Sequence, residues 1–224
     1  MLTRTAALVL ALCVGFVSLA EAQRRHPVSG RVLAPVMGVG GAPWLERPER
    51  ESEEAPSKAL AALDLKPGMV VADIGAGSGY YTSRMSKLVG ATGRVYATDI
   101  QPGMLELLTR RIQAEGLANV TPVLGGMDDP KLPPGSIDLA IMVDVYHELQ
   151  SPQLFLQRLR GVFKPGGRLV LFEFRKEDPQ VPILQVHKMS VAEVKMELEA
   201  EGFMLDKVID VLPWQHIIVL RAKN

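Results

Sequence analysis

From Ser57 onward the sequence alternates between helical and strand-like segments, and this alternation limits the possible folds more than any other feature. The spacing of apolar residues predicts helices over Ser57–Leu63, Tyr80–Leu88, Pro102–Glu115, Ser151–Phe163 and residues 190–202. Apolar runs predict strands over Met69–Asp73, Arg94–Thr98, Val120–Leu124, Ile137–Val143, Arg168–Phe174, Met204–Leu212 and His216–Ala222. Strands that alternate with helices form a parallel sheet whose two faces the helices cover.

The last two predicted strands are an exception to this parallel arrangement. Only Pro213-Trp214-Gln215 separates them, and three residues are too few for a parallel crossover. These two strands must therefore pair antiparallel. The fold class that we expect is α/β, a doubly wound, seven-stranded and mostly parallel sheet with an antiparallel last strand, formed by residues 57–224.

The first 22 residues have the pattern of a secretory signal peptide. A positive charge at residues 1–4, an apolar run at residues 6–20 and the small-residue site Ala20-Glu21-Ala22 predict cleavage after Ala22 and export, to the periplasm. The alternative is an uncleaved anchor with the domain facing the cytoplasm, which Arg24 and Arg25 would favour. The apolar run is shorter than the roughly 20 residues that span a bilayer, which favours cleavage and no stable membrane span.

Residues 23–56 are irregular, with five prolines and the charged tract Glu46–Glu54. One interpretation is a solvated linker, because charged and proline-rich tracts bury little apolar surface. The other is a lid over the active site, with Trp44 as its apolar anchor. Lysine and arginine balance aspartate and glutamate at 25 each, so no basic field is available for nucleic acid, which we do not expect as a partner.

The stretch VVADIGAGSG, residues 70–79, joins the first predicted strand to a glycine loop. Its spacing is G-x-G-x-G, and Tyr80 stands where the dinucleotide fingerprint G-x-G-x-x-G has its third glycine. Asp73 would repel a pyrophosphate but would favour a cationic amino-acid group. Asp99 ends the second strand, at the height where a carboxylate accepts ribose hydroxyls, although NAD-binding proteins also have such a residue.

Four motifs in order, between about Ala59 and Phe174, resemble the class I S-adenosylmethionine-dependent methyltransferases. They are DIGAGSG, ATDIQPGML, GGMDDPKLPPGSID and LRGVFKPGGRLVL. The reversed last strand is similar to that family as well. The resemblance implies S-adenosyl-L-methionine as cofactor and transfer of its methyl group to an acceptor that the sequence does not identify, which we expect to be a small molecule.

The resemblance also implies a set of cofactor-binding residues: Asp73, Gly75, Ala76, Gly77, Gly79, Asp99, Ile100, Met127 and Asp128. The glycines would lie beneath the methionine moiety, with Asp73 toward its ammonium group. Asp99 would hold the ribose diol and Ile100 would pack on the adenine. The family commonly has Asp after Gly in the third-strand loop, where this chain has Gly126.

Asp128 is the replacement that we consider for this missing adenine contact, with Met127 against the ring. This assignment shifts the family's position by two residues. The alternative is that Asp128-Asp129-Pro130 forms a solvated turn, which such residues favour.

Candidate catalytic residues follow the fourth strand, because strand ends at this edge of an open α/β sheet line the ligand crevice. They are Asp144, Tyr146 and His147. His147 is the natural general base, since the unperturbed pKa of histidine lies near neutrality. In the alternative interpretation His147 and Glu148 only cap the helix region that follows.

We predict no metal site. His147 and Glu148 are adjacent in the sequence, which is not the helical spacing of two ligands on one face, and His187 lies in a segment without an acidic cluster. His187 is predicted to be a surface residue in the loop of residues 178–189. This loop and residues 23–56 are the segments that would shape the acceptor site.

Two other functions remain open at the sequence level. The first is a nicotinamide-dependent oxidoreductase, which Tyr80 and Asp73 disfavour. The second is a non-catalytic protein that binds the nucleoside and senses a ligand. Export also conflicts with a cofactor that is made in the cytoplasm, so an exported enzyme would need it supplied.

Overall fold

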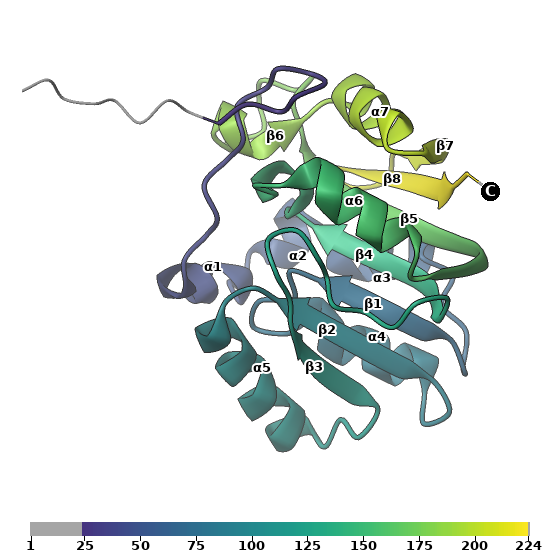
Figure 1. The fold of residues 1–224 in the computed structure, drawn as a ribbon. Helices are drawn as coiled ribbons and strands as arrows, with labels where there is room; N and C mark the ends of the chain where they lie inside the picture. The colour runs from purple at the N-terminus through teal and green to yellow at the C-terminus, as the bar shows by residue number, and fades with distance from the viewer. Residues whose placement is uncertain (1–23, 224) are drawn as a thin grey trace, which may run out of the picture.

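A computed structural model describes residues 24–223 of the chain (Figure 1). The predicted signal peptide at residues 1–22 lies outside the described residues, so its cleavage stays a prediction. Within residues 24–223, no helix is both long enough and apolar enough to cross a membrane.

One sheet organises the chain, with the strand order β3-β2-β1-β4-β5-β8-β7. The strands are β1 Val70–Ile74, β2 Arg94–Asp99, β3 Val120–Leu124, β4 Ile137–Val143, β5 Phe163–Arg175, β6 Lys188–Met189, β7 Phe203–Ile209 and β8 Gln215–Ala222. Strands β1 to β5 pair in parallel, and β8 runs antiparallel to both β5 and β7. This confirms the predicted fold class. The short strand β6, which pairs with the end of β5, was not predicted.

The helices cover both faces of the sheet, as the alternation predicts. They are η1 Val39–Gly41, α1 Ala42–Leu45, α2 Arg50–Glu53, α3 Pro56–Ala62, α4 Tyr80–Val89, α5 Pro102–Glu115, η2 Tyr146–Glu148, α6 Pro152–Arg160, η3 Gln185–His187 and α7 Val191–Ala200. Alternate strand residues face opposite ways: Val71 and Ile141 belong to a core with α3, α4 and α5, whereas Ala72 and Met142 belong to a core with α6 and α7. Figure 1 shows α4 behind the sheet and α6 in front of it.

Local sequence signals set most helix ends. The capping box of Ser190 and Glu193 begins α7, and Gly116 ends α5 in the left-handed conformation. The helix that was predicted to begin at Ser57 begins one residue earlier. Helix α3 begins at Pro56, and its N-cap is Ala55 at φ 48°, without a side-chain cap. Proline is well placed at a first helical position, which explains the shift.

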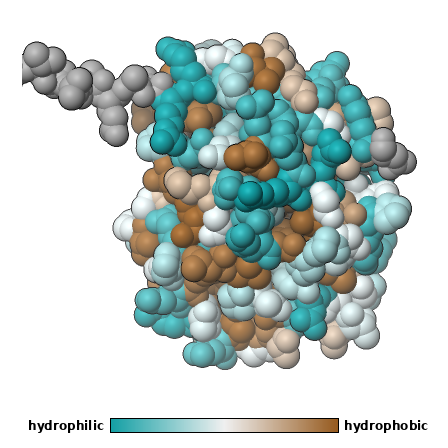
Figure 2. Space-filling model, viewed as in Figure 1, coloured by the Kyte–Doolittle hydropathy of each residue, from teal (hydrophilic) through white to brown (hydrophobic). Residues whose placement is uncertain are grey.

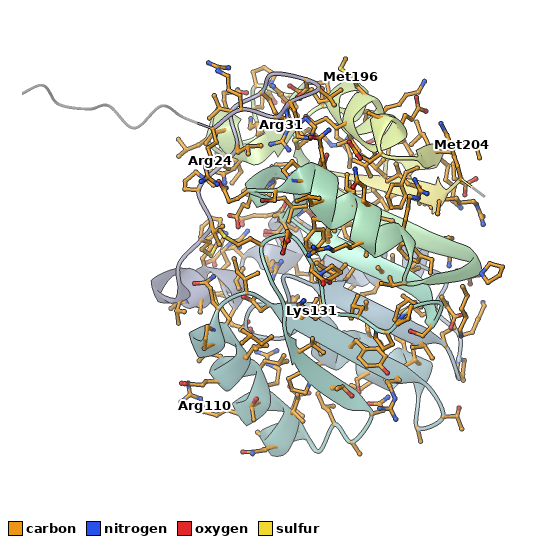
Figure 3. All side chains as sticks on the ribbon, in the orientation of Figure 1. Arg24, Arg31, Arg110, Lys131, Met196 and Met204 are labelled. Atoms are coloured by element: carbon orange, nitrogen blue, oxygen red, sulfur yellow. The ribbon has the colours of Figure 1, made fainter. Side chains whose placement is uncertain are left out.

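Residues 24–55, here called the N-terminal strap, pack along the edge of the sheet where the parallel strands end (Figure 1). The Arg31 guanidinium donates to the carboxylate of Glu197 on α7, with N···O distances of 2.8 and 3.1 Å. Figure 3 shows Arg31 beside α7. Farther along, the Ser78 hydroxyl of the glycine loop donates to the carboxylate of Glu46. The strap is thus attached to the domain at both ends.

Candidate functional site

A cavity of about 490 Å³ opens at the carboxyl ends of the parallel strands. This is the edge where open α/β sheets bind ligands, and the volume lies in the range of small-molecule sites. Its walls come from the ends of β1, β2, β4 and β5, from the strap, and from the loop before β6. Figure 2 shows hydrophobic side chains gathered toward this edge of the molecule, at the left of the view.

The glycine loop forms one wall of the cavity. Gly75 and Gly77 line it, and both have positive φ, at 71° and 54°. A Cβ at Gly75 would lie 2.5 Å from the Val145 side chain, and one at Gly77 would lie 2.7 Å from Leu45 of the strap. The N–H groups of Gly75 and Ala76 both donate to the Thr98 carbonyl, which ties the loop to β2. Only glycine satisfies both constraints, the backbone angle and the absence of space.

Asp99 and Ile100 line the cavity at the end of β2. The Asp99 carboxylate accepts the N–H of Gly77 at 3.0 Å and the N–H of Gln101 at 2.9 Å. Burial raises the pKa of Asp99. Each carboxylate oxygen has more than one lone pair, so both oxygens can accept a further hydrogen bond from a ligand. Gly126 and Met127 line the cavity beyond Ile100.

Four residues of the implied cofactor-binding set do not line the cavity. Asp73 is 3% exposed, and its carboxylate accepts a hydrogen bond from the Thr82 hydroxyl of α4 at 2.6 Å. Burial raises the pKa of Asp73 to about 6. Ala76 points into the core. Gly79 faces α5, and Asp128 forms an exposed ion pair with Arg158 at 2.7 Å.

Asp144 stands at the end of β4, with φ at 54°, and lines the cavity. Its Oδ2 accepts from the Gln215 side-chain amide at 2.7 Å, and its Oδ1 has no hydrogen-bond partner among the described residues. Burial, together with the charges of Glu54 and Glu173, raises the pKa of Asp144 well above its usual value. A strained backbone and an unpaired carboxylate oxygen at one residue are typical of a ligand-binding position.

A hydrogen-bonded chain of three side chains reaches the cavity beside Asp144. His147 is 1% exposed, and its Nδ1 lies 2.6 Å from Oε2 of Glu173. Its Nε2 lies 3.1 Å from Nδ1 of His187. Both histidines line the cavity. Because the buried Glu173 carboxylate can only accept at that contact, Nδ1 of His147 carries a proton and Nε2 is the nitrogen directed at His187.

Glu148 completes a cluster with the two histidines. Its carboxylate lies 4.0 Å from Nδ1 of His187 and accepts the N–H of Met37 at 3.2 Å. One ligand-type atom from each of His147, Glu148 and His187 lies within 4.8 Å of the others. The sequence predicted His187 on the surface and no such cluster. The fold brings it here because η3 and β6 return to the end of β5.

Tyr146, the third predicted catalytic residue, does not line the cavity. Its ring is fully buried, and its hydroxyl donates to Glu197 of α7 at 2.8 Å. The Arg31 guanidinium of the strap lies over the same ring. The structure therefore brings Asp144 and His147 together at the cavity and directs Tyr146 away from it.

The strap closes the cavity opposite the strand ends. Trp44, Leu45, Arg50 and Glu54 all line it. Arg50 is only 4% exposed, donates to Glu54 at 2.6 Å, and packs over the Tyr80 ring. These strap residues are therefore part of the cavity wall, and whether the segment acts as a lid stays a prediction.

Sequence reasoning missed Glu173 and Arg50 as parts of the site. Glu173 had a signal: it is a charged residue within the apolar run of β5, and such residues are seldom buried without a partner. Arg50 had none, since it lies in a tract where nearly every residue is charged.

Comparisons with known proteins agree on one family. A protein-family model described as "Methyltransferase domain" matches residues 72–171. A ubiquinone/menaquinone biosynthesis C-methyltransferase from Burkholderia multivorans is 33% identical over 118 residues, which are 52% of this chain and 48% of that protein. A protein of the same description from Shewanella pealeana is 28% identical over 123 residues. The chain spans about half the length of these curated relatives.

Solved structures extend the similarity over the whole domain. A SAM-dependent methyltransferase from Aquifex aeolicus is 30% identical with a TM-score of 0.78, and the match covers 83% of this chain and 98% of that one. A type 11 methyltransferase from Sulfolobus solfataricus, described as putative, has a TM-score of 0.63 at 19% identity, covers 76% of this chain and 94% of its own, and shares the fold.

Proposed function

The chain belongs to the S-adenosylmethionine-dependent methyltransferase family, and from this premise we propose that it methylates a small, largely apolar acceptor with an acidic hydroxyl group. The observation that carries the proposal is the chain Glu173–His147–His187, which ends in the cavity among apolar side chains. Family membership disfavours the oxidoreductase alternative.

The cavity residues fit the family's cofactor. Gly75 and Gly77 bring the backbone to the cavity wall, where a Cβ would clash with Val145 or Leu45. Asp99 keeps lone pairs on both oxygens for a ribose diol. The unpaired Oδ1 of Asp144 is available to a ligand in the cavity, and a cationic sulfonium centre nearby would favour the ionised form of this carboxyl group. We assign cofactor binding to these residues with Ile100 and Met127, and not to Asp73, Ala76, Gly79 or Asp128. When bound, S-adenosylmethionine supplies an electrophilic methyl group.

The acceptor end of the cavity supports an apolar substrate. Phe174, Pro182, Ile183 and Leu184 line it around the histidine pair. Such walls favour an apolar ring and exclude water from the reacting groups. The curated relatives are described as C-methyltransferases of ubiquinone and menaquinone biosynthesis, which supports a quinol-like acceptor for this chain.

The hydroxyl group is the part of the acceptor on which the histidine pair acts. A phenol becomes a strong nucleophile, at oxygen or at the adjacent ring carbon, only when its proton leaves. We assign His147 and His187 to favouring this deprotonated acceptor, with Glu173 holding the His147 ring in place. The cavity walls hold the acceptor in line with the methyl group, and this positioning supplies much of the acceleration.

Transfer of isotope-labelled methyl groups tests the proposal. The native protein and the His147→Ala variant are incubated with labelled S-adenosylmethionine and a panel of phenols, quinols and naphthols, with the corresponding aryl amines as comparators. We expect label in hydroxylated products only, and a loss of about 10²-fold or more in His147→Ala, as is usual for a positioned acid–base group. His216→Asn is the matched control, because His216 pairs with Glu177 outside the cavity. Labelling of amines alone, or an unchanged His147→Ala rate, would refute it.

A further inference from the structure

We propose that His147, Glu148 and His187 form a binding site for a divalent transition-metal cation of the Zn²⁺ type. The role of the cation toward the acceptor rests on the proposed function. Binding of the cation does not, because it is measured without cofactor or acceptor. The site is the cluster at the acceptor end of the cavity, where the end of β4 meets the loop before β6.

The spacing of the two ring nitrogens fits one shared ion. Nε2 of His147 and Nδ1 of His187 lie 3.1 Å apart. Two nitrogens that each bind one ion at about 2.1 Å and at the tetrahedral angle are separated by about 3.4 Å, so moving the two rings apart by about 0.3 Å would admit the ion. The rings meet at 84°, so they approach each other edge to face and do not stack. Two imidazole nitrogens this close share either the hydrogen of one ring's N–H group or a metal ion.

The surroundings of His147 favour the metal ion. Metal-binding histidines commonly donate their second ring N–H to a carboxylate, which fixes the tautomer and increases the basicity of the ligand nitrogen. Nδ1 of His147 makes this contact with Glu173, which is 0% exposed, at 2.6 Å. Nε2, the nitrogen left for a metal ion, faces the cluster.

Glu148 supplies the anionic ligand. Its carboxylate lies 4.0 Å from Nδ1 of His187, and rotation of the side chain toward the rings would bring it within reach of an ion between them. Two histidines and one glutamate are a ligand set found in catalytic zinc sites, where a further position stays open. Here the cavity borders all three residues, so the open position would face the acceptor.

The local charge also suits a cation. Glu173 lies behind His147, Asp144 lies at the adjacent strand end, and Glu148 belongs to the cluster. Arg50 is a nearby cation in the cavity wall, and it is paired with Glu54. With a metal ion bound, the two ring nitrogens would be its ligands and would not accept the proton themselves. The ion would then hold the anionic oxygen of the acceptor and lower the pKa of its hydroxyl group.

Titration with Co²⁺ tests the site, because Co²⁺ occupies zinc-type sites and its visible absorption reports coordination. The untagged protein is treated with a chelator, dialysed, and titrated with Co²⁺ and, by calorimetry, with Zn²⁺. We expect one equivalent per chain. His187→Ala and Glu148→Gln should each weaken binding by at least about 10-fold, and Glu173→Gln by about 10- to 100-fold through the orientation of His147.

Two controls keep the outcomes distinct. His216→Ala, which removes a histidine outside the cluster, should bind Co²⁺ as the native protein does. Binding of S-adenosylhomocysteine is measured on every variant and shows both that the variant is folded and that the cofactor site is intact. Absence of saturable Co²⁺ binding in a protein that binds S-adenosylhomocysteine overturns the metal site alone. Equal Co²⁺ affinity in His187→Ala also overturns it, whereas loss of S-adenosylhomocysteine binding by the native protein overturns the proposed function.

Discussion

Replacing Asp99 with asparagine tests the cofactor end of the cavity. The two carboxylate oxygens accept N–H groups of Gly77 and Gln101 at 3.0 and 2.9 Å and keep lone pairs for the two ribose hydroxyls. Hydrogen bonds to a charged group contribute about 1.5–3 kcal/mol each. Asn retains one acceptor oxygen and places an amide donor where the other was. We therefore expect a loss of about 2–3 kcal/mol, which is a roughly 30- to 150-fold weaker cofactor affinity.

Calorimetric titration with S-adenosylhomocysteine measures this affinity without turnover. Asp128→Asn is the matched control, since Asp128 pairs with Arg158 on the surface and does not line the cavity. Its affinity should stay within twofold of native. The reasoning is refuted if Asp99→Asn keeps its melting temperature and binds within threefold of the native protein. It is also refuted if Asp128→Asn loses as much affinity, because the adenine contact would then involve Asp128.

Two further predictions follow from the glycine loop and the strand before it. Gly75→Ala should abolish most S-adenosylhomocysteine binding, because φ is 71° and the new Cβ would lie 2.5 Å from Val145. Gly30→Ala is the control: φ is 73°, so the backbone strain of about 1–2 kcal/mol is the same, but nothing lies within 4 Å of the new Cβ. This variant should bind S-adenosylhomocysteine normally. Burial raises the pKa of Asp73 from 3.8 to about 6, so the folded protein binds this proton more tightly than the unfolded chain does. The resulting stabilisation of the fold is about 3 kcal/mol. It is fully present below about pH 4 and is lost as the pH rises through about 6. Urea unfolding of Asp73→Asn between pH 4 and 7 should show a flatter profile than the native protein, and an unchanged slope would contradict the assignment.

Much of the fold could be predicted because its signals are local. The predicted bounds of α5, β3 and β4 agree with the structure. A proline at the helix start, a glycine after its end and strand segments rich in apolar and β-branched residues mark them. The prediction for α6 ran to Phe163, but the helix ends at Arg160 and Phe163 begins β5. The apolar residues between Arg160 and Phe163 fit a helix or a strand. The pairing of Phe163 with Ile137 of β4 places Phe163 in the strand.

The cofactor end of the site was predictable only in part. Gly75, Gly77, Asp99 and Ile100 lie at a strand end or within three residues after one, so sequence position alone brings them to the cavity. Asp73 belongs to the same motif but precedes the end of β1, and the alternation of strand side chains turns it toward α4. The glycine motif predicts where the loop lies. It does not predict which way the side chain of each strand residue before the loop points.

The acceptor end depends on contacts between distant segments, which the sequence pattern does not contain. His147 and Glu173 are 26 residues apart, and His147 and His187 are 40 apart. The first pair meets because β4 and β5 are parallel neighbours, which the predicted topology implied. The second depends on β6, a pairing of two residues that has no apolar pattern of its own.

The strap shows why a charged, proline-rich tract is not always solvated. In isolation its residues have too few apolar groups to form a core. Its charges are instead paired within the folded protein: Arg31 with Glu197 of α7, and Arg50 with Glu54 over the Tyr80 ring. Buried ion pairs contribute little net stability but strongly penalise any arrangement that separates them. The ion pairs therefore specify where the strap lies. The Met37 N–H also donates a hydrogen bond to the Glu148 carboxylate, which connects the strap to the acceptor end of the cavity.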